Sequence, residues 1–139
     1  MAAAVAASPT RPTPGGLIDE VLRHTPQGPV RDGIALARRL LTISDPVLAA
    51  RRLGNGRAVS AQDTIPFTLW AAARHLNDYA AAFWTTAAAG GDVDTTCAIV
   101  GGIVGARTPP PPEWLRQSEP PPAWADVPPP RWADAPTTG

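Results

Sequence analysis

One short segment, Gly-Gly-Asp-Val-Asp-Thr, holds the residues of this chain that are best suited to chemistry. Two glycines, Gly90 and Gly91, are followed by two carboxylates one residue apart, Asp92 and Asp94, and by the hydroxyl of Thr95. Hard divalent cations such as Mg²⁺ and Mn²⁺ prefer oxygen ligands of this kind. Aspartate and threonine are also common helix N-cap residues, and taken alone the pattern favours a cap over a metal site.

An all-α framework is expected to position this segment, because no stretch of the chain alternates apolar and polar residues as a half-buried strand does. The last strong helix is predicted from about Asp94 to Ala106 and is apolar on nearly all sides, which is typical of a helix buried in a larger protein. Gly101 and Gly105, four residues apart, would allow a neighbouring helix to come close. A set of five or six short helices that includes one so apolar resembles part of the core of a larger protein more than a complete small bundle.

The helices upstream are predicted from apolar spacing and from cap residues. Asp45 is expected to cap a helix that has Pro46 at its first position. Ser60 or Asp63 is expected to cap the helix containing Trp70, with a proline in its first turn at position 66. A second interpretation makes residues 55–62 a wall of a substrate cleft, with Ser60 contacting substrate. Capping is the favoured interpretation.

Composition excludes several functional classes. Twelve basic and twelve acidic residues give no net charge, and a nucleic-acid-binding protein usually shows a basic excess. No apolar run is long enough to span a bilayer, so no membrane role is expected. The single cysteine, Cys97, cannot form an internal disulfide, which favours a cytoplasmic location.

Proline divides the chain. Eighteen prolines are present, and eleven of them follow Ala106. We therefore expect a remnant helix and linker over residues 1–14, a helical domain over residues 15–107, and a Pro/Trp-rich, disordered tail over residues 108–139. A five-residue repeat in that tail carries Trp124 and Trp132, and such segments can also dock in partner grooves.

Residues 90–106 resemble the C-terminal signature of the ADP-ribosylglycohydrolase family. Residues 53–56, 60–67 and 69–76 match upstream segments of the same family, and residues 112–115 look like its continuation. The similarity runs from about Gly15 to Arg107. The Asp-x-Asp-Thr motif is short, but its combination with Ser-Ala-Gln-Asp-Thr at the right distance is specific.

The resemblance implies an all-α fold with two divalent metals, Mg²⁺ or Mn²⁺, in a central cleft. It implies hydrolysis of the bond between ADP-ribose and an acceptor, so the partner would be an ADP-ribosylated protein or a small molecule containing ADP-ribose. Asp92, Asp94 and Thr95 match the family's C-terminal metal ligands, with Asp94 as the bridge between the ions. Gly90 and Gly91 would shape the loop beside the ribose. The metals would polarise a water and orient the ribose.

The sequence departs from the family in its N-terminal part. The family's Thr-Asp-Asp cluster and its catalytic acidic residue have no counterpart, so no residue of this chain is assigned as catalytic. Three oxygen ligands from one helix end are too few to hold two metals tightly. We therefore expect a truncated, poorly active fragment that needs a missing N-terminal half, or a chain that covers its apolar helix by self-association. The alternative is a non-catalytic helical interaction module with a Pro/Trp docking tail.

Overall fold

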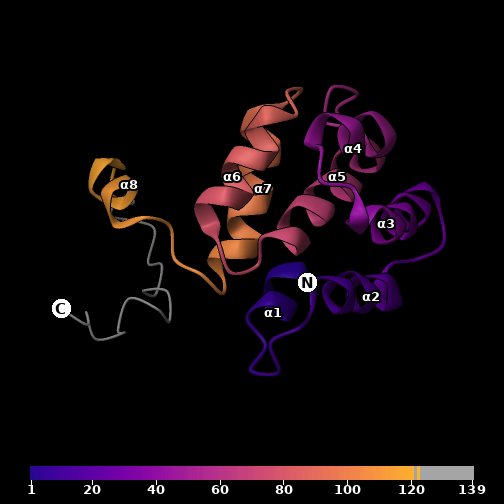
Figure 1. Cartoon of the computed structure of the whole chain (residues 1–139), viewed down its shortest axis with the longest axis horizontal. Helices are drawn as coiled ribbons and strands as arrows, with labels where there is room; N and C mark the ends of the chain where they lie inside the picture. The colour runs from indigo at the N-terminus through magenta and orange to yellow at the C-terminus, as the bar shows by residue number, and fades with distance from the viewer. Residues whose placement is uncertain (121, 123–139) are drawn as a thin grey trace.

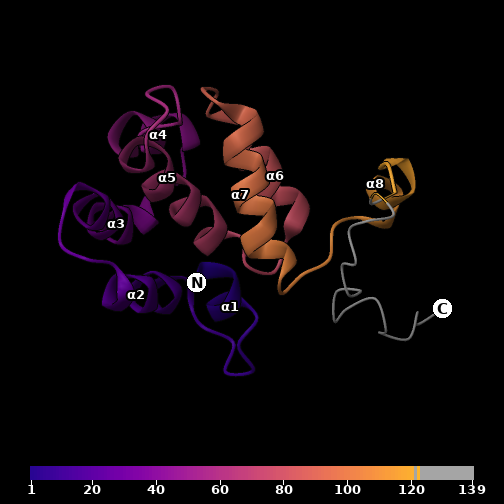
Figure 2. The same cartoon turned by 180° about the vertical axis from the view of Figure 1, so that it is seen from behind.

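The computed structural model describes residues 1–120 and 122, and all regular structure in that part of the chain is helical, which confirms the all-α expectation (Figures 1 and 2). The elements in chain order are α1 (Ala2–Ala6), α2 (Pro14–His24), α3 (Pro29–Arg39), a 3₁₀ turn (Leu40–Thr42), α4 (Pro46–Leu53), α5 (Ala61–Arg74), α6 (Tyr79–Ala88), α7 (Val93–Gly105) and α8 (Pro112–Gln117). None of the helices described is long and apolar enough to cross a membrane.

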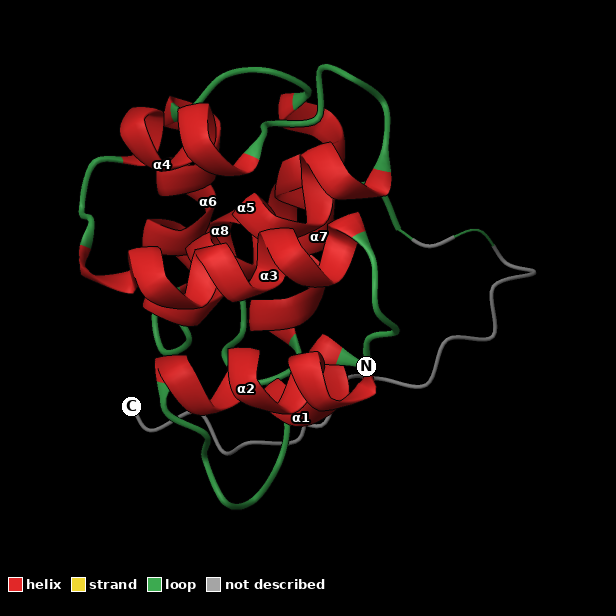
Figure 3. Ribbon diagram, turned by 90° about the vertical axis from the view of Figure 1, so that its right-hand side faces the viewer, coloured by secondary structure: helices red, strands yellow, loops and turns green. Residues whose placement is uncertain are grey.

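Helix α5 forms the centre of the core. It contacts α2, α3, α4, α6 and α7. Phe67 and Trp70 are fully buried on it and stack with ring centroids 5.7 Å apart. The indole Nε1 of Trp70 donates a hydrogen bond to the carbonyl oxygen of Leu40 at 2.9 Å, so the buried polar atom is satisfied. Helices α4, α3 and α2 follow one another down one side of the molecule (Figure 3).

The position of Pro66 corrects one prediction. Because α5 begins at Ala61, Pro66 lies inside the helix and not in its first turn. A proline there cannot donate a backbone hydrogen bond to the preceding turn. Its ring is fully buried against α3, where a Cβ on Gly33 would come within 2.5 Å of the Pro66 Cγ. Pro66 is therefore a packing residue, and Gly33, which has no side chain, leaves space for its ring.

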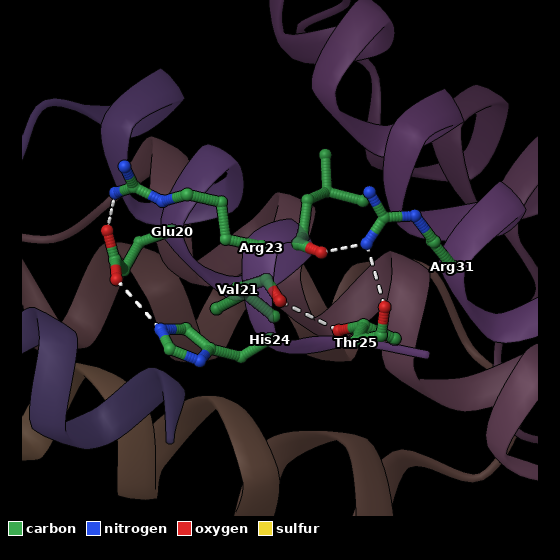
Figure 4. Close-up of polar contacts among 7 residues, drawn as sticks. Glu20, Val21, Arg23, His24, Thr25 and Arg31 are labelled. Carbon is green, nitrogen blue, oxygen red and sulfur yellow. Dashed lines mark hydrogen bonds and ion pairs between the residues drawn. The ribbon is translucent and has the colours of Figure 1, made fainter. Parts of the chain in front are cut away.

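Polar contacts join α2 to the start of α3 (Figure 4). Arg31 donates hydrogen bonds to the carbonyl oxygens of Leu22 and Thr25, the second at 2.7 Å. These carbonyls lie at the C-terminal end of α2, where few backbone donors remain, and the guanidinium adds donors to them. On the exposed side of α2, Glu20 binds the ring of His24 at 3.1 Å.

Helix α7 packs closely on α6 through its glycines. A Cβ on Gly101 would lie 2.6 Å from the hydroxyl oxygen of Tyr79, and one on Gly105 would lie 3.4 Å from the Tyr79 ring. The close approach expected at these two glycines is confirmed, and the neighbour is an aromatic side chain of α6. One face of α7 is buried by α1, α5 and α6.

The segment predicted as a tail contains helix α8. Trp114 on this helix packs edge-to-face against Phe83 and Trp84 of α6, with ring centroids 5.2 and 6.0 Å apart, and also contacts Tyr79. These contacts hold α8 to α6 across the intervening proline run. The repeat that carries Trp124 and Trp132 lies outside the described residues.

Candidate functional site

Asp92 caps helix α7. Its Oδ1 accepts a hydrogen bond from the backbone nitrogen of Thr95 at 3.1 Å, and its backbone carbonyl accepts from the Thr96 nitrogen at 3.0 Å. The Thr96 hydroxyl, which is fully buried, donates to the same carbonyl at 2.8 Å. Asp92 is half-buried, and its second carboxylate oxygen accepts no hydrogen bond from the described residues. One oxygen thus fixes the helix end, and the other has no hydrogen-bond donor among the described residues.

The two glycines before Asp92 bring a second loop against the site. Gly90 and Gly91 have φ values of +65° and +85°, which favour glycine. A Cβ on Gly91 would lie 2.3 Å from the carbonyl oxygen of Asn55. That same carbonyl accepts a hydrogen bond from the Asp92 backbone nitrogen at 3.0 Å, and a Cβ on Gly56 would meet the Asp92 side chain at 2.8 Å. The loop between α4 and α5 therefore lies directly on the α6–α7 loop, and Figures 1 and 2 show both at the same end of the molecule.

Asp63, in the first turn of α5, holds the α4–α5 loop in shape. Its Oδ2 accepts a hydrogen bond from the Ala58 nitrogen at 2.8 Å, and its carbonyl accepts from the Gly56 nitrogen at 3.0 Å. Gly54, at φ +92°, lies so close that a Cβ there would meet the Asp63 carbonyl oxygen at 2.2 Å. Ser60 occupies the N-cap position of α5, but its hydroxyl makes no capping hydrogen bond. The side-chain cap expected from Ser60 or Asp63 is therefore absent, because Asp63 binds the loop instead.

The tip of this loop is strained. Val59 has φ +50° and is 88% exposed. A β-branched residue rarely adopts that conformation, and the surrounding contacts must hold it there. The sequence predicted that residues 55–62 could line a cleft, but not the contact of Asn55 and Gly56 with the Asp92 segment. The glycines at 54 and 56 in one loop and at 91 in the other were the signal that could have pointed to two loops in close contact.

Asp94 and Thr95 lie on the exposed face of α7 and do not cap the helix. Ala98 and Gly102, one and two turns further along this face, are both exposed. These two residues help line an apolar groove of about 410 Å³, together with residues of α1 and α5. The same side of α7 thus carries oxygen ligands at its start and an open apolar groove along its length.

The donors of this segment fit a hard divalent cation in type but not in number. Asp92, Asp94 and Thr95 offer carboxylate and hydroxyl oxygens, which suit Mg²⁺ or Mn²⁺. Such ions take about six ligands. No group of three or more His, Cys, Asp or Glu side chains able to hold a metal occurs in the described part of the chain. The residues present would therefore supply only part of the ligands that such an ion needs.

The remaining reactive side chains near the site are structural. Burial, followed by the charge of Asp94, raises the pKa of the Cys97 thiol. The thiol donates to the carbonyl oxygen of Phe83, with the two atoms 3.8 Å apart. A buried thiol with a raised pKa is a poor nucleophile. The ring of His75 forms a hydrogen bond with the Thr85 hydroxyl at 3.0 Å.

Comparison with known families identifies the family of the chain. The sequence profile of the ADP-ribosylglycohydrolase family matches residues 1–129 of the 139-residue chain. This chain belongs to the ADP-ribosylglycohydrolase family. The match extends past both ends of the range over which the motifs showed a resemblance. No curated protein and no solved structure gives a significant match.

Proposed function

We propose that this chain provides one half of the metal site of an ADP-ribose hydrolase, with Asp92, Asp94 and Thr95 as ligands for Mg²⁺ or Mn²⁺. The reaction would be cleavage of ADP-ribose from a modified protein or from another acceptor. The observation that carries the proposal is the glycine loop of a member of this family, in which Asp92 is fixed by one carboxylate oxygen and leaves the other open. When bound, the metal would supply Lewis-acid chemistry.

The chain's own residues would position the ligands. The Asn55 carbonyl holds the Asp92 backbone, and the buried Thr96 hydroxyl fixes the first turn of α7. Gly90 and Gly91 carry no side chain that would obstruct a ribose approaching the carboxylates. Ser60, at the start of α5, is half-buried beside the α4–α5 loop and would contact substrate there.

We further propose that the remaining ligands come from a complementing polypeptide, either a separate N-terminal half or a second copy. The described residues supply too few oxygen donors for two ions. The open groove along α7 supports this proposal, because a helix seated on Ala98 and Gly102 would end beside Asp94. In isolation the chain should bind metal weakly and hydrolyse slowly or not at all.

The test is isothermal titration of the full chain with Mn²⁺, using Asp92→Asn and Asp94→Asn as variants. Asparagine caps a helix as well as aspartate does, so Asp92→Asn removes the charge and keeps the fold. Asp78→Asn is the matched control, because Asp78 caps α6 through the Ala81 nitrogen at 2.9 Å but follows no glycine loop. We expect weak binding that both site variants abolish and the control retains. Equal affinity in all four proteins would contradict the proposal.

Hydrolysis is tested with an ADP-ribosylated arginine or serine peptide, by measuring free ADP-ribose. The chain is assayed alone and mixed with a polypeptide that carries a Thr-Asp-Asp cluster. Release that needs both polypeptides and the Asp94 carboxylate supports complementation. If metal binds but no mixture releases ADP-ribose, the alternative is favoured, in which the chain is a non-catalytic interaction module.

A further inference from the structure

Helices α6 and α8 together form a patch of four aromatic side chains. Tyr79, Phe83 and Trp84 come from α6, and Trp114 comes from α8. The centroid of the Trp114 ring lies 6.1, 5.2 and 6.0 Å from those of the other three rings in that order. Figures 1 and 2 show α8 on the same side of the molecule as α6 and away from α2, α3 and α4. We call these four side chains the aromatic patch.

The aromatic patch is open to solvent at Trp84. This residue is 61% exposed, and its ring packs edge-to-face against the rings of Phe83 and Trp114. The indole nitrogens of Trp84 and Trp114 donate no hydrogen bond to another described residue, whereas that of the buried Trp70 donates to the Leu40 carbonyl. An exposed aromatic surface with unused N–H donors suits an extended polypeptide, which offers apolar side chains and backbone carbonyls together.

The distribution of aromatic residues in the sequence indicates what such a polypeptide could be. The chain has eight of them, of which Phe67 and Trp70 are buried in the core and four form the aromatic patch. The other two are Trp124 and Trp132, each of which follows a proline by two residues in the five-residue repeat. Proline-rich segments bind surfaces lined by aromatic rings, because their extended backbone makes no internal hydrogen bonds and its carbonyls remain free to accept.

The repeat is also close to the aromatic patch along the chain. Trp124 follows Trp114 by ten residues. At about 3.1 Å per residue, a proline-rich segment of that length can reach about 31 Å. The exposed Trp84 ring is only 6.0 Å from the Trp114 ring. A segment tethered this closely has an effective concentration on the order of millimolar at the patch, so weak contacts are enough to hold it there.

We propose that residues 122–134 bind the aromatic patch of the same chain, with the tryptophan of at least one repeat packed against Trp84. The bound segment would cover Trp84 and add to the contacts through which Trp114 holds α8 on α6. It would also keep the tryptophans of the repeat from the grooves of other proteins. This inference does not rest on the proposed function, because the aromatic patch includes none of the candidate ligands.

The experiment records two-dimensional nitrogen–proton NMR spectra of the full, isotope-labelled chain, in which each of the five tryptophans gives one indole N–H peak. Replacing each tryptophan in turn with phenylalanine assigns the peaks. The double variant Trp124→Ser/Trp132→Ser removes the proposed contacts. Arg131→Gln is the matched control, because it changes the residue before Trp132 and keeps both rings. The buried Trp70, whose N–H is bonded to Leu40, is the internal reference for the fold.

We expect the peaks of Trp84 and Trp114 to move in the double variant while the Trp70 peak stays in place. Arg131→Gln should leave the Trp84 peak where it is. The reciprocal variant Trp84→Ser changes an exposed residue, so the core should be kept. It should move the peak of Trp124 or of Trp132, since one of them loses the ring that it packs against.

A Trp84 peak that does not move in the double variant overturns the proposal, as does an equal movement in Arg131→Gln. Movement of the Trp70 peak as large as that of the Trp84 peak also overturns it, because the effect is then not confined to the aromatic patch. The spectra are repeated at several protein concentrations. If the difference between the double variant and the unmodified chain disappears on dilution, the repeat of a second copy is the occupant and binding within one chain is excluded.

Discussion

The backbone carbonyl oxygen of Asn55 lies 3.0 Å from the backbone nitrogen of Asp92 and accepts its hydrogen bond. This bond joins the loop after α4 to the loop before α7. A capping aspartate is usually positioned by its own helix, but here a second loop also sets where the carboxylate lies. Changes in either loop should therefore alter the position of the Asp92 carboxylate.

Gly91→Ala should be much more harmful than Gly90→Ala. Both residues have positive φ, which costs a non-glycine residue about 1–2 kcal/mol. Only at Gly91 would the new Cβ collide with a backbone atom, the Asn55 carbonyl oxygen. We expect Gly91→Ala to lower the free energy of unfolding by about 2–5 kcal/mol and Gly90→Ala by about 1–2 kcal/mol. Urea denaturation measures both, and equal midpoints would show that the loop contact is unimportant.

Alanine at two neighbouring glycines of α7 should have opposite effects. A Cβ on Gly102 meets nothing within 4 Å, so Gly102→Ala should stabilise the protein by about 1 kcal/mol through helix propensity. A Cβ on Gly101 would overlap the Tyr79 hydroxyl oxygen, so Gly101→Ala should be neutral or destabilising.

Removing that hydroxyl provides the control. In a Tyr79→Phe background the nearest ring carbon would be 3.5 Å from the new Cβ, an ordinary contact. Gly101→Ala should therefore become stabilising there, as Gly102→Ala is. Thermal unfolding of the double-mutant cycle gives the coupling. A coupling of zero would mean that the Tyr79 hydroxyl does not set the spacing of α6 and α7.

His75 should make stability depend on pH near neutrality. Burial, and next the charge of Arg74, lower the pKa of His75 below 6.5, while Asp78 opposes the shift. Between the folded and unfolded pKa values the unfolded chain binds more protons, so stability rises with pH. The contribution is complete above pH 6.5 and is lost as the pH falls toward the folded-state pKa.

Replacing His75 with glutamine should flatten this dependence. Glutamine can still bind the Thr85 hydroxyl, which the ring contacts at 3.0 Å, so the fold is kept. Urea midpoints measured at intervals from about pH 7.5 to 5.5 test this, with His24→Gln on the exposed side of α2 as control. If the slope persists unchanged in His75→Gln, the histidine is not its source.

Trp114→Ala should release α8 from the bundle. Each edge-to-face aromatic pair contributes about 0.5–1.5 kcal/mol, and Trp114 contacts the three rings of Tyr79, Phe83 and Trp84. Loss of these contacts should expose Arg116, in the last turn of α8, to trypsin at a faster rate. The variant Leu115→Ala, which changes an exposed neighbouring residue, should be cleaved by trypsin at the same rate as the unmodified protein. Equal cleavage of the two variants would show that α8 is held by other contacts.

Local signals in the sequence predicted the helix ends well. Asp45 caps α4 through hydrogen bonds from Val47 and Leu48 at 2.8 and 3.2 Å, as expected. Asp78 caps α6 in the same way. The aspartate before α7 follows the same rule. These caps depend on residues within one turn, so the order of residue types is enough to find them.

Contacts between distant segments were not predictable from the same signals. The expectation of a proline in a first turn at position 66 failed because tertiary packing against Gly33 outweighed the local rule. The expected side-chain cap of α5 failed because Asp63 binds the Ala58 nitrogen in a folded loop. The bond from Asp92 to the Asn55 carbonyl uses main-chain atoms, which every residue type supplies, so the glycines indicate a close approach there but do not identify its partner.

The close fit of these two loops has a consequence for how the family's sequences can diverge. A side chain at position 91 would require the backbone at position 55 to move away. A side chain at position 56 would likewise require Asp92 to move away. Neither Gly56 nor Gly91 can therefore be replaced alone while the facing loop keeps its position. Residues 54–56 and 90–92 should therefore vary together among related sequences. Relatives that lack the glycine in one of these loops should also have an altered sequence in the facing loop.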